Sequence, residues 1–140
     1  MFFCFVFRNG KYFGGAKVSF IIYVIEYQHR GLPHAHIACR MTNAPNHKHP
    51  QECIAYIEQF ISAEMPAEED AEYHDHVKTK MLHKCSAACA RHDNGLCKYG
   101  YNTPLTVGST TLDEKGYPIY KRRREQDLKV VPHSREVLFD

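Results

Sequence analysis

The chain has 140 residues, which is enough for one domain with a modest hydrophobic core. Hydrophobic residues make up 44% of it and charged residues 24%, a composition that excludes a disordered or fibrous protein. The formal net charge of +2 does not by itself indicate what the protein binds. No apolar run approaches the roughly 20 residues that cross a bilayer, and the apolar residues 1–7 are too few for a secretory signal. We therefore expect an intracellular protein without membrane contact, located in the nucleus if the source is a eukaryote.

Two neighbouring segments predict an antiparallel β-hairpin. Val18–Tyr27 is rich in β-branched and aromatic residues and is apolar on both faces, which predicts a strand buried at the centre of a sheet. The residues that follow include Gly31 and Pro33, which favour a turn. His34–Arg40 then predicts the returning strand.

The middle of the chain predicts two helices. Gln51–Ala63 has apolar residues at helical spacing, and Pro50 before it suits a first helical turn. Glu68–Leu82 predicts a second helix, acidic at its start and basic at its end, as the helix dipole favours. Residues 83–107 are irregular and contain cysteines, and Asp113–Arg124 predicts a turn followed by a short strand. A GxxxxGK[ST] phosphate loop is absent from the sequence, so nothing indicates ATP hydrolysis.

The predicted hairpin brings metal-binding side chains together. If the strands pair around a turn centred on Gly31, Gln28 lies opposite His34 and Glu26 lies opposite His36. Because side chains alternate between faces, all four project from one face, with opposed Cβ atoms about 5 Å apart. Two imidazoles with a carboxylate or an amide suit a divalent cation and leave positions for water and substrate. The alternative is a polar strand surface that binds no metal.

The stretch with this pattern resembles a known family. Tyr23–Ile37 reads YVIEYQHRGLPHAHI and resembles the hallmark of Helitron-type Rep endonucleases, also described as the Helitron helicase-like N-terminal domain. These enzymes belong to the HUH endonucleases, named for a His–hydrophobe–His motif that corresponds here to residues 34–36. The resemblance covers most of the chain from about Tyr12 onward. It continues through ISAEMP at 61–66, residues 81–97, GYPIYKRRR at 116–124 and VVPHSREVLFD at 130–140.

The resemblance implies a fold and a metal site. The fold is expected to be α+β and ferredoxin-like, with a central antiparallel sheet that is incomplete here and a cysteine-bearing loop region. Residues 1–140 then form one partial domain. His34 and His36 match the family's ligands for Mg²⁺ or Mn²⁺. Glu26 matches the position of a third, acidic ligand, and Gln28 is the alternative for that role.

The resemblance also implies an activity. Members of the family bind single-stranded DNA, then nick and transfer it during rolling-circle transposition, using a tyrosine that forms a 5′-phosphotyrosine link. That tyrosine is expected beyond Asp140, so no catalytic residue is assigned within this chain. A helicase domain is expected downstream in the full-length parent. One alternative is a non-catalytic, zinc-stabilised module that binds single-stranded DNA. Another is a hydrolase that activates water, which would need more acidic ligands than Glu26.

A second group of metal-binding residues lies in the irregular region. His83, Cys85, Cys89 and Cys97 form a His-x-Cys-x3-Cys-x7-Cys series, and His92 is an alternative fourth ligand. One imidazole and three thiolates suit a tetrahedral structural zinc, which would order a segment that has few apolar residues. Residues 83–97 are therefore a candidate zinc-binding insertion. The alternative is a set of buried, reduced thiols.

A basic run near the C-terminus is the candidate DNA contact. It consists of Lys121, Arg122, Arg123 and Arg124, and tyrosines stand near it in the sequence at positions 99, 101, 117 and 120. Proteins that hold single strands combine basic residues that follow the phosphates with aromatic rings that stack on the bases. The alternative is a solvated surface strand, and the family resemblance favours the DNA contact.

Overall fold

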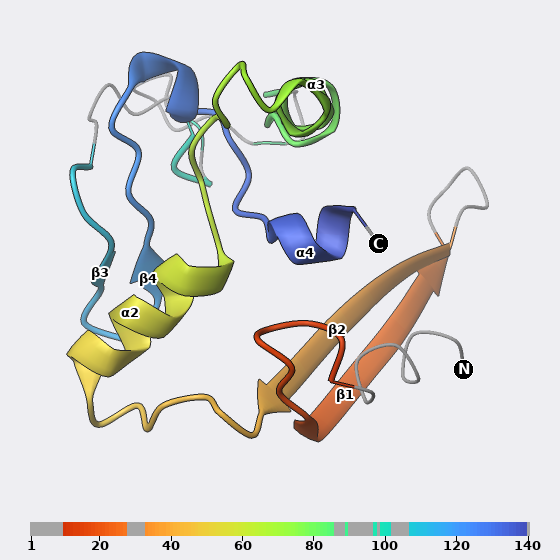
Figure 1. The fold of residues 1–140 in the computed structure, drawn as a ribbon, viewed down its shortest axis with the longest axis vertical. Helices are drawn as coiled ribbons and strands as arrows, with labels where there is room; N and C mark the ends of the chain where they lie inside the picture. The colour runs from red at the N-terminus through yellow and green to blue at the C-terminus, as the bar shows by residue number, and fades with distance from the viewer. Residues whose placement is uncertain are drawn as a thin grey trace. The chain divides into compact units, whose positions relative to one another are not determined.

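A computed structural model describes residues 10–27, 33–85, 89, 97, 99–101 and 107–139 (Figure 1). The chain divides into two compact units, Met1–Asn46 and His47–Asp140. The first unit contains the hairpin, and the second contains the helices and the cysteine-bearing region. Helices and antiparallel strands are both present, so the predicted mixture of α and β structure is confirmed.

The first unit is built on a hairpin of β1 (Val18–Tyr27) and β2 (Pro33–Met41). β1 has the predicted bounds, and β2 extends the predicted strand by one residue at each end. Beyond the last pair of the ladder, the Thr42 N–H donates a hydrogen bond of 2.8 Å to the Lys17 carbonyl. Backbone hydrogen bonding between the two segments therefore continues one step beyond the ladder, at the end away from the turn.

The register of the hairpin differs from the predicted one by two residues. Glu26 lies opposite His34 and Val24 lies opposite His36, so the predicted pairs of Glu26 with His36 and of Gln28 with His34 are wrong. The ladder is centred one residue earlier in the sequence than predicted. An alternating pattern specifies the face that each residue occupies, but it does not specify which residue lies at the centre of the hairpin. Since the shift is by two residues, Glu26, His34 and His36 stay on one face. Gln28 lies outside the described residues.

The prediction that Val18–Tyr27 is buried on both faces is wrong in this structure. Val24, on the face of Glu26, is 55% exposed, and Ile25, on the opposite face, is 50% exposed. Among the described residues β1 pairs only with β2, and no described helix lies within Met1–Asn46. Apolar side chains are buried only where a second layer packs against them, and a sequence pattern does not reveal where that layer comes from.

In the second unit, helix α2 (Pro50–Phe60) begins where predicted and ends earlier than the predicted Gln51–Ala63. Pro50 stands in its first turn, where a missing N–H is tolerated. The helix ends because Ile61 has an extended backbone and Ser62 pairs with His133, each donating its N–H to the other's carbonyl at 2.9 Å. A long-range backbone bridge therefore overrides the helical pattern.

Helix α3 (Ala71–Lys80) is also shorter than the predicted Glu68–Leu82. The residues before it form a turn in which the Asp70 N–H donates to the Ala67 carbonyl at 3.2 Å. Its C-terminal end is set by Leu82, which forms an antiparallel bridge with Val130. As with α2, the boundary is fixed by a partner that is distant in sequence.

The remaining elements are short. β3 (Thr111–Leu112) and β4 (Pro118–Ile119) form a second antiparallel pair, joined by the predicted turn. A 3₁₀ helix at Glu125–Asp127 and helix α4 (Arg135–Leu138) follow. In the turn, the Asp113 carboxylate accepts hydrogen bonds from the N–H groups of residues 115 and 117. This is the local bonding by which aspartate favours turns.

The hydrophobic core cluster found among the described residues of the second unit is small. Its buried members are Met65, Val77 and Val130. Partly buried side chains pack around them: Tyr73, Met81, Leu82 and Leu138. Because this core is small, the polar contacts that fix its borders carry a larger share of the stability.

One buried carboxylate joins two distant segments beside this core. Asp127 is 0% exposed and accepts a hydrogen bond from the Met65 N–H at 2.8 Å. It also accepts from the Arg124 N–H at 2.9 Å and from the Arg124 Nε and Nη2 at 3.1 and 3.0 Å. The Arg124 guanidinium in turn donates to the Met65 carbonyl. A buried charge with this many partners is stabilised where an unpaired one would be strongly unfavourable.

Replacing Asp127 with alanine is expected to lower the free energy of unfolding of the second unit by about 2–4 kcal/mol, because two backbone N–H groups and a guanidinium lose their acceptor. Urea denaturation followed by circular dichroism measures this loss. Glu125→Ala, which removes an exposed carboxylate from the same 3₁₀ helix, is the matched control and should leave the midpoint unchanged. Equal midpoints for the two variants would contradict the assigned role of Asp127.

Candidate functional site

The hairpin places the three predicted metal ligands at one end of its ladder. Glu26 comes from β1, and His34 and His36 come from β2. His36 Nε2 lies 3.2 Å from Glu26 Oε2, and the two imidazole rings have centroids 4.8 Å apart. The side chains of His36 and Glu26 are 58% and 63% exposed. The alternation of β-strand side chains therefore brings two imidazoles and a carboxylate together on an open surface.

The hairpin contains ligand types that divalent cations use, although its three side chains converge less closely than a metal site requires. Imidazole nitrogen and carboxylate oxygen are ligands for Mn²⁺ and related ions, and Glu26 and His36 already lie within contact distance of each other. An exposed ion pair of this kind contributes little stability, so an incoming cation loses little by displacing it. The open face leaves room for water or a phosphate oxygen.

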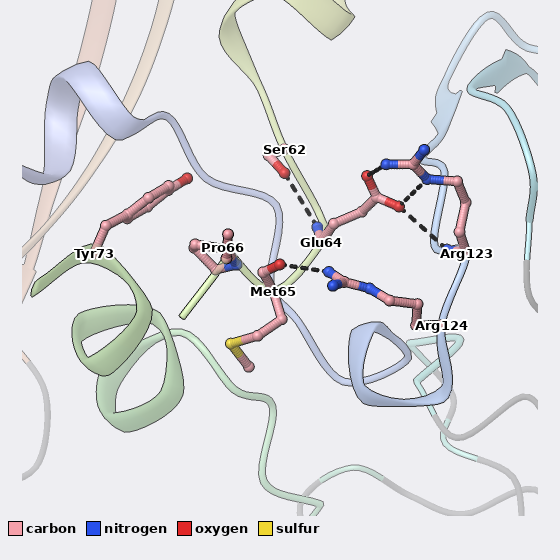
Figure 2. Close-up of a pocket in the computed structure, with 8 residues that line it drawn as sticks. Ser62, Glu64, Met65, Pro66, Tyr73, Arg123 and Arg124 are labelled. Carbon is pink, nitrogen blue, oxygen red and sulfur yellow. Dashed lines mark hydrogen bonds and ion pairs between the residues drawn. The ribbon is translucent and has the colours of Figure 1, made fainter. Parts of the chain in front are cut away.

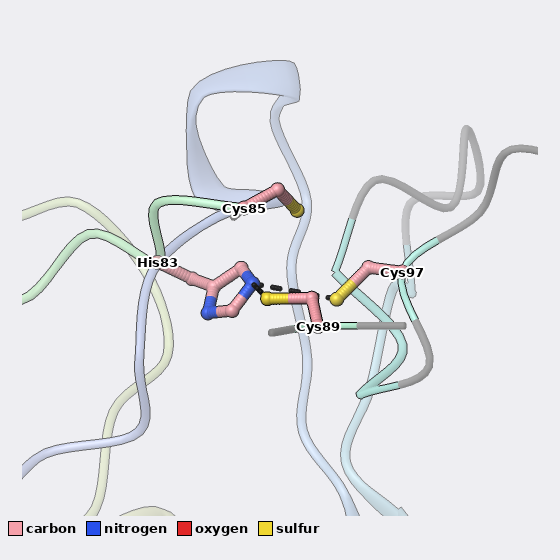
Figure 3. A group of neighbouring side chains, drawn as sticks. All are labelled: His83, Cys85, Cys89 and Cys97. Atoms are coloured by element: carbon pink, nitrogen blue, oxygen red, sulfur yellow. Dashed lines mark hydrogen bonds between the residues drawn. The ribbon is translucent and has the colours of Figure 1, made fainter. Parts of the chain in front are cut away.

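The cysteine-bearing region forms a tighter group. The ligand atoms of His83, Cys85, Cys89 and Cys97 all lie within 4.8 Å of one another (Figure 3). His83 Nε2 lies 3.5 Å from the Cys89 sulfur and 3.3 Å from the Cys97 sulfur. Cys89 and Cys97 are buried. Among the described residues this is the one group of histidine, cysteine or acidic side chains that converges closely enough to hold a metal ion.

These four residues can bind a metal such as zinc. Structural zinc takes three thiolates and one imidazole readily, and ligands about 2.3 Å from a tetrahedral ion lie roughly 4 Å apart. The observed spread of the ligand atoms is close to that requirement. The predicted set is therefore brought together in space, and His92, the alternative ligand, lies outside the described residues.

Backbone and aromatic contacts fix His83 within this group. Its N–H donates to the Lys129 carbonyl at 2.8 Å, next to the bridge that ends α3. Its ring stacks on Tyr101, with centroids 4.2 Å apart and an interplanar angle of 15°, and meets the edge of Tyr99 at 6.2 Å. The sequence grouped both tyrosines with the basic run, and the structure places them against the cysteine cluster.

Three members of the basic run are paired with carboxylates. Lys121 Nζ lies 3.4 Å from Glu58, and Arg124 is bound to Asp127. Arg123 binds Glu64 through two nitrogens, Nε to Oε1 at 2.7 Å and Nη2 to Oε2 at 2.8 Å (Figure 2). Such bidentate pairs are the strong form of this contact. These three cations hold the second unit together, and their charge is largely compensated.

Arg122 differs from its neighbours. Its Nη2 donates to the Val130 carbonyl at 3.0 Å, and its guanidinium carbon lies 5.8 Å from the centre of the Tyr101 ring. Its buried Nε makes no hydrogen bond in the structure as described. The run that looks uniform in sequence thus contains three structural cations and one cation directed at an aromatic ring.

A pocket of about 520 Å³ lies beside the paired arginines (Figure 2). Its lining is Ser62, Glu64, Met65, Pro66, Ala67, Tyr73, Arg123 and Arg124. The Tyr73 hydroxyl lies 2.7 Å from His133 Nε2, and His133 Nδ1 lies 2.8 Å from the Val131 carbonyl. Burial raises the pKa of Tyr73 and lowers that of His133, so both are neutral at neutral pH. The Nδ1–H then donates to Val131 and the tyrosine O–H donates to Nε2.

The Tyr73–His133 pair was missed by sequence reasoning. Its members are 60 residues apart, and neither belongs to a short motif. Long-range contacts bring them together, among them the bridge between Ser62 and His133 and the ion pair between Asp70 and Arg135. The neutral state of both groups fits a structural hydrogen bond next to the core.

No family model, no curated protein and no solved structure matches this chain. In the described part of the chain, none of the helices has the length and apolar character needed to cross a bilayer.

Replacing Cys97 with serine is expected to abolish tight metal binding by the cysteine cluster, because a hydroxyl is a poor ligand for a soft tetrahedral site. The test is titration with Co²⁺, whose sulfur-to-metal charge-transfer absorption reports on thiolate ligands alone. Cys39→Ser removes an exposed thiol from β2 and should leave that absorption intact. The cluster assignment fails if wild type and Cys97→Ser show the same spectrum.

The ion pair between Glu64 and Arg123 predicts a pH dependence of stability. Hydrogen bonding from Arg123 holds the pKa of Glu64 below its ordinary value of 4.5. A carboxylate whose pKa is lowered by folding stabilises the fold at pH values above its ordinary pKa. That stabilisation is lost as the pH falls through the lowered pKa of the folded state.

Glu64→Gln should therefore be less stable than wild type at pH 7, and the gap between the two should close as the pH falls below about 4.5. Urea midpoints measured from pH 7 to pH 3 give the comparison. Glu68→Gln, on an exposed turn, should follow wild type throughout. A gap that stays constant with pH would show that Glu64 acts through packing and not through its charge.

Proposed function

We propose that this chain is part of a metal-dependent endonuclease that nicks single-stranded DNA and transfers the cut strand, of the Helitron-type Rep class among HUH endonucleases. The observation that carries the proposal is the hairpin, in which the ladder puts Glu26 opposite His34 and next to His36. This arrangement supports the assignment of these three side chains as ligands for Mg²⁺ or Mn²⁺. The sequence stretch around them, residues 23–37, supports the class.

The chemistry divides between the cation and the protein. A divalent cation bound at the hairpin would polarise the scissile phosphodiester and offset the charge that develops during attack. Glu26, His34 and His36 would hold this cation on the solvent-exposed face of the hairpin. A tyrosine oxygen, expected beyond Asp140, attacks phosphorus while the 3′ oxygen of the cut strand leaves. The new phosphotyrosine ester retains the energy of the broken bond, so rejoining needs no ATP.

In this proposal the cysteine cluster has a structural role. Its four protein ligands complete a tetrahedral shell, which leaves no position for substrate. Zinc held there would fix His83 and the tyrosines packed against it.

A non-catalytic, zinc-stabilised module that binds single-stranded DNA is the second candidate. The observation that favours it is the closer convergence of the cysteine cluster compared with the open hairpin site. The two candidates differ in whether the hairpin binds a hard divalent cation, and this difference can be measured.

Calorimetric titration of zinc-saturated protein with Mn²⁺ should reveal a saturable site that His34→Ala/His36→Ala abolishes, because the double variant removes both imidazoles from the hairpin face. His47→Ala/His49→Ala is a matched control, since it removes two exposed histidines at the same spacing, one of them beside Glu52. The control should bind Mn²⁺ like wild type. Indistinguishable Mn²⁺ binding by the two double variants would exclude the hairpin as the site.

Strand transfer is tested with a chain extended past Asp140 to include the expected tyrosine. With Mn²⁺ and a single-stranded oligonucleotide labelled at its 3′ end, the label should become covalently attached to the protein. The attachment should be absent in the His34→Ala/His36→Ala variant of the extended chain. An extended chain that binds Mn²⁺ and DNA but forms no covalent product would favour the second candidate.

A further inference from the structure

A second pocket, of about 380 Å³, lies beside the cysteine cluster. Tyr99, Tyr101 and Tyr120 line it together with Arg122, and apolar residues complete its wall, among them Pro118. This volume lies within the range of about 300–1,000 Å³ that is common for small-molecule sites. All of its lining residues belong to the second unit.

The tyrosines of this pocket are positioned by the rest of the unit. Tyr101 is stacked on His83, so the cysteine cluster helps to fix its ring. Tyr120 directly follows β4 (Pro118–Ile119). Burial raises the pKa of Tyr120, so its phenol stays neutral and can donate or accept a hydrogen bond. The pocket therefore combines flat aromatic surface with a neutral polar group.

Arg122 gives the pocket its charge. No carboxylate lines the pocket as described, and the side chain of Arg122 uses only a backbone carbonyl and the Tyr101 ring as partners within the described chain. The neighbouring Arg123 and Arg124 have their charges compensated by Glu64 and Asp127. A guanidinium has several N–H donors, and buried donors without acceptors are uncommon. Arg122 thus provides positive charge and spare donors at an aromatic wall.

We propose that this pocket binds one nucleotide of a single strand, with the base against Tyr99 or Tyr120 and the phosphate at Arg122. The Tyr101 ring supports Arg122, because His83 is stacked on the same ring. This inference depends on the proposed function in one respect, namely that the proposed function identifies the strand as DNA. Single-strand binders combine aromatic rings, which stack on any base, with positive charge that follows the phosphates. Of the four basic residues at 121–124, Arg122 is then the one that contacts nucleic acid.

A proline-rich peptide is the competing occupant, because such peptides also dock on aromatic surfaces. The uncompensated charge of Arg122 favours an anionic ligand, which a nucleotide is and a proline-rich segment is not. The test therefore includes both ligands.

Binding of a fluorescein-labelled oligothymidylate of about 12 nucleotides, a length within the usual site size of single-strand binders, is measured by fluorescence anisotropy on zinc-saturated protein. Arg122→Gln should weaken binding about tenfold and lower the salt dependence by about one phosphate contact. Lys115→Gln removes the same charge from the exposed turn between β3 and β4 and should change binding less than twofold.

Tyr120→Leu and Tyr120→Phe separate stacking from folding. Leucine should weaken binding about tenfold, and phenylalanine, which keeps the ring, should restore it to within about twofold of wild type. This pair keeps the test decisive if Arg122→Gln proves unstable. Oligonucleotide binding is measured without Mn²⁺ or Mg²⁺, so failure of the hairpin metal site is distinguishable from failure of this pocket.

Three results would overturn the proposal. The first is an absence of oligonucleotide binding by folded, zinc-saturated wild type. The second is equal binding by wild type, Arg122→Gln and Tyr120→Leu. The third is binding of a proline-rich peptide that is lost in Tyr120→Leu while oligonucleotide binding is kept.

Discussion

The buried carboxylate of Asp127 is the constraint on which the second unit depends. A charge with no solvent exposure must be paired, and its partners are the Met65 N–H and the backbone and guanidinium of Arg124. These contacts fix the segment at 124–127 against the segment that follows α2. The adjacent bridge between Leu82 and Val130 then ends α3 and positions His83, so the cysteine cluster is built on the same support.

This constraint explains why four consecutive basic residues differ in role. In an extended segment, successive side chains point to alternate sides. Arg122 bridges to Val107 through its backbone and reaches the Tyr101 ring, whereas Arg123 turns to Glu64 and Arg124 to Asp127. Acidic partners that come from before α3 neutralise some of the run. Three of the four cations are therefore paired with carboxylates, whereas the described partners of the Arg122 side chain are a backbone carbonyl and an aromatic ring.

Sequence reasoning predicted local features well and long-range ones poorly. The strand Val18–Tyr27, the face shared by Glu26, His34 and His36, and the membership of the cysteine cluster follow from short-range patterns and are present. The shared face survived an error of two residues in register because side-chain direction repeats every second residue.

The remaining features depend on partners distant in sequence, which no local pattern encodes. The ends of α2 and α3 are set by residues 133 and 130. The Met65 N–H that binds Asp127 lies 62 residues away in sequence, and the His133 ring that binds Tyr73 lies 60 residues away. The exposure of β1 likewise depends on a covering layer that its own sequence does not specify.

The two candidate metal sites differ in chemical character, and the difference sets the order in which they fill. Thiolates at the cysteine cluster prefer soft and borderline ions, whereas the carboxylate of the hairpin suits Mg²⁺ and Mn²⁺ and its imidazoles suit borderline divalent ions. Zinc binds both kinds of ligand, but four converging ligands with three sulfurs hold it more tightly than an open group of three on a solvated hairpin. Under the proposed assignment zinc would therefore fill the cluster first, so Mn²⁺ binding would report on Glu26, His34 and His36 only in zinc-saturated protein. The cluster would then keep all four of its ligand positions for the structural ion, whereas the hairpin would leave positions of its ion open to water or substrate.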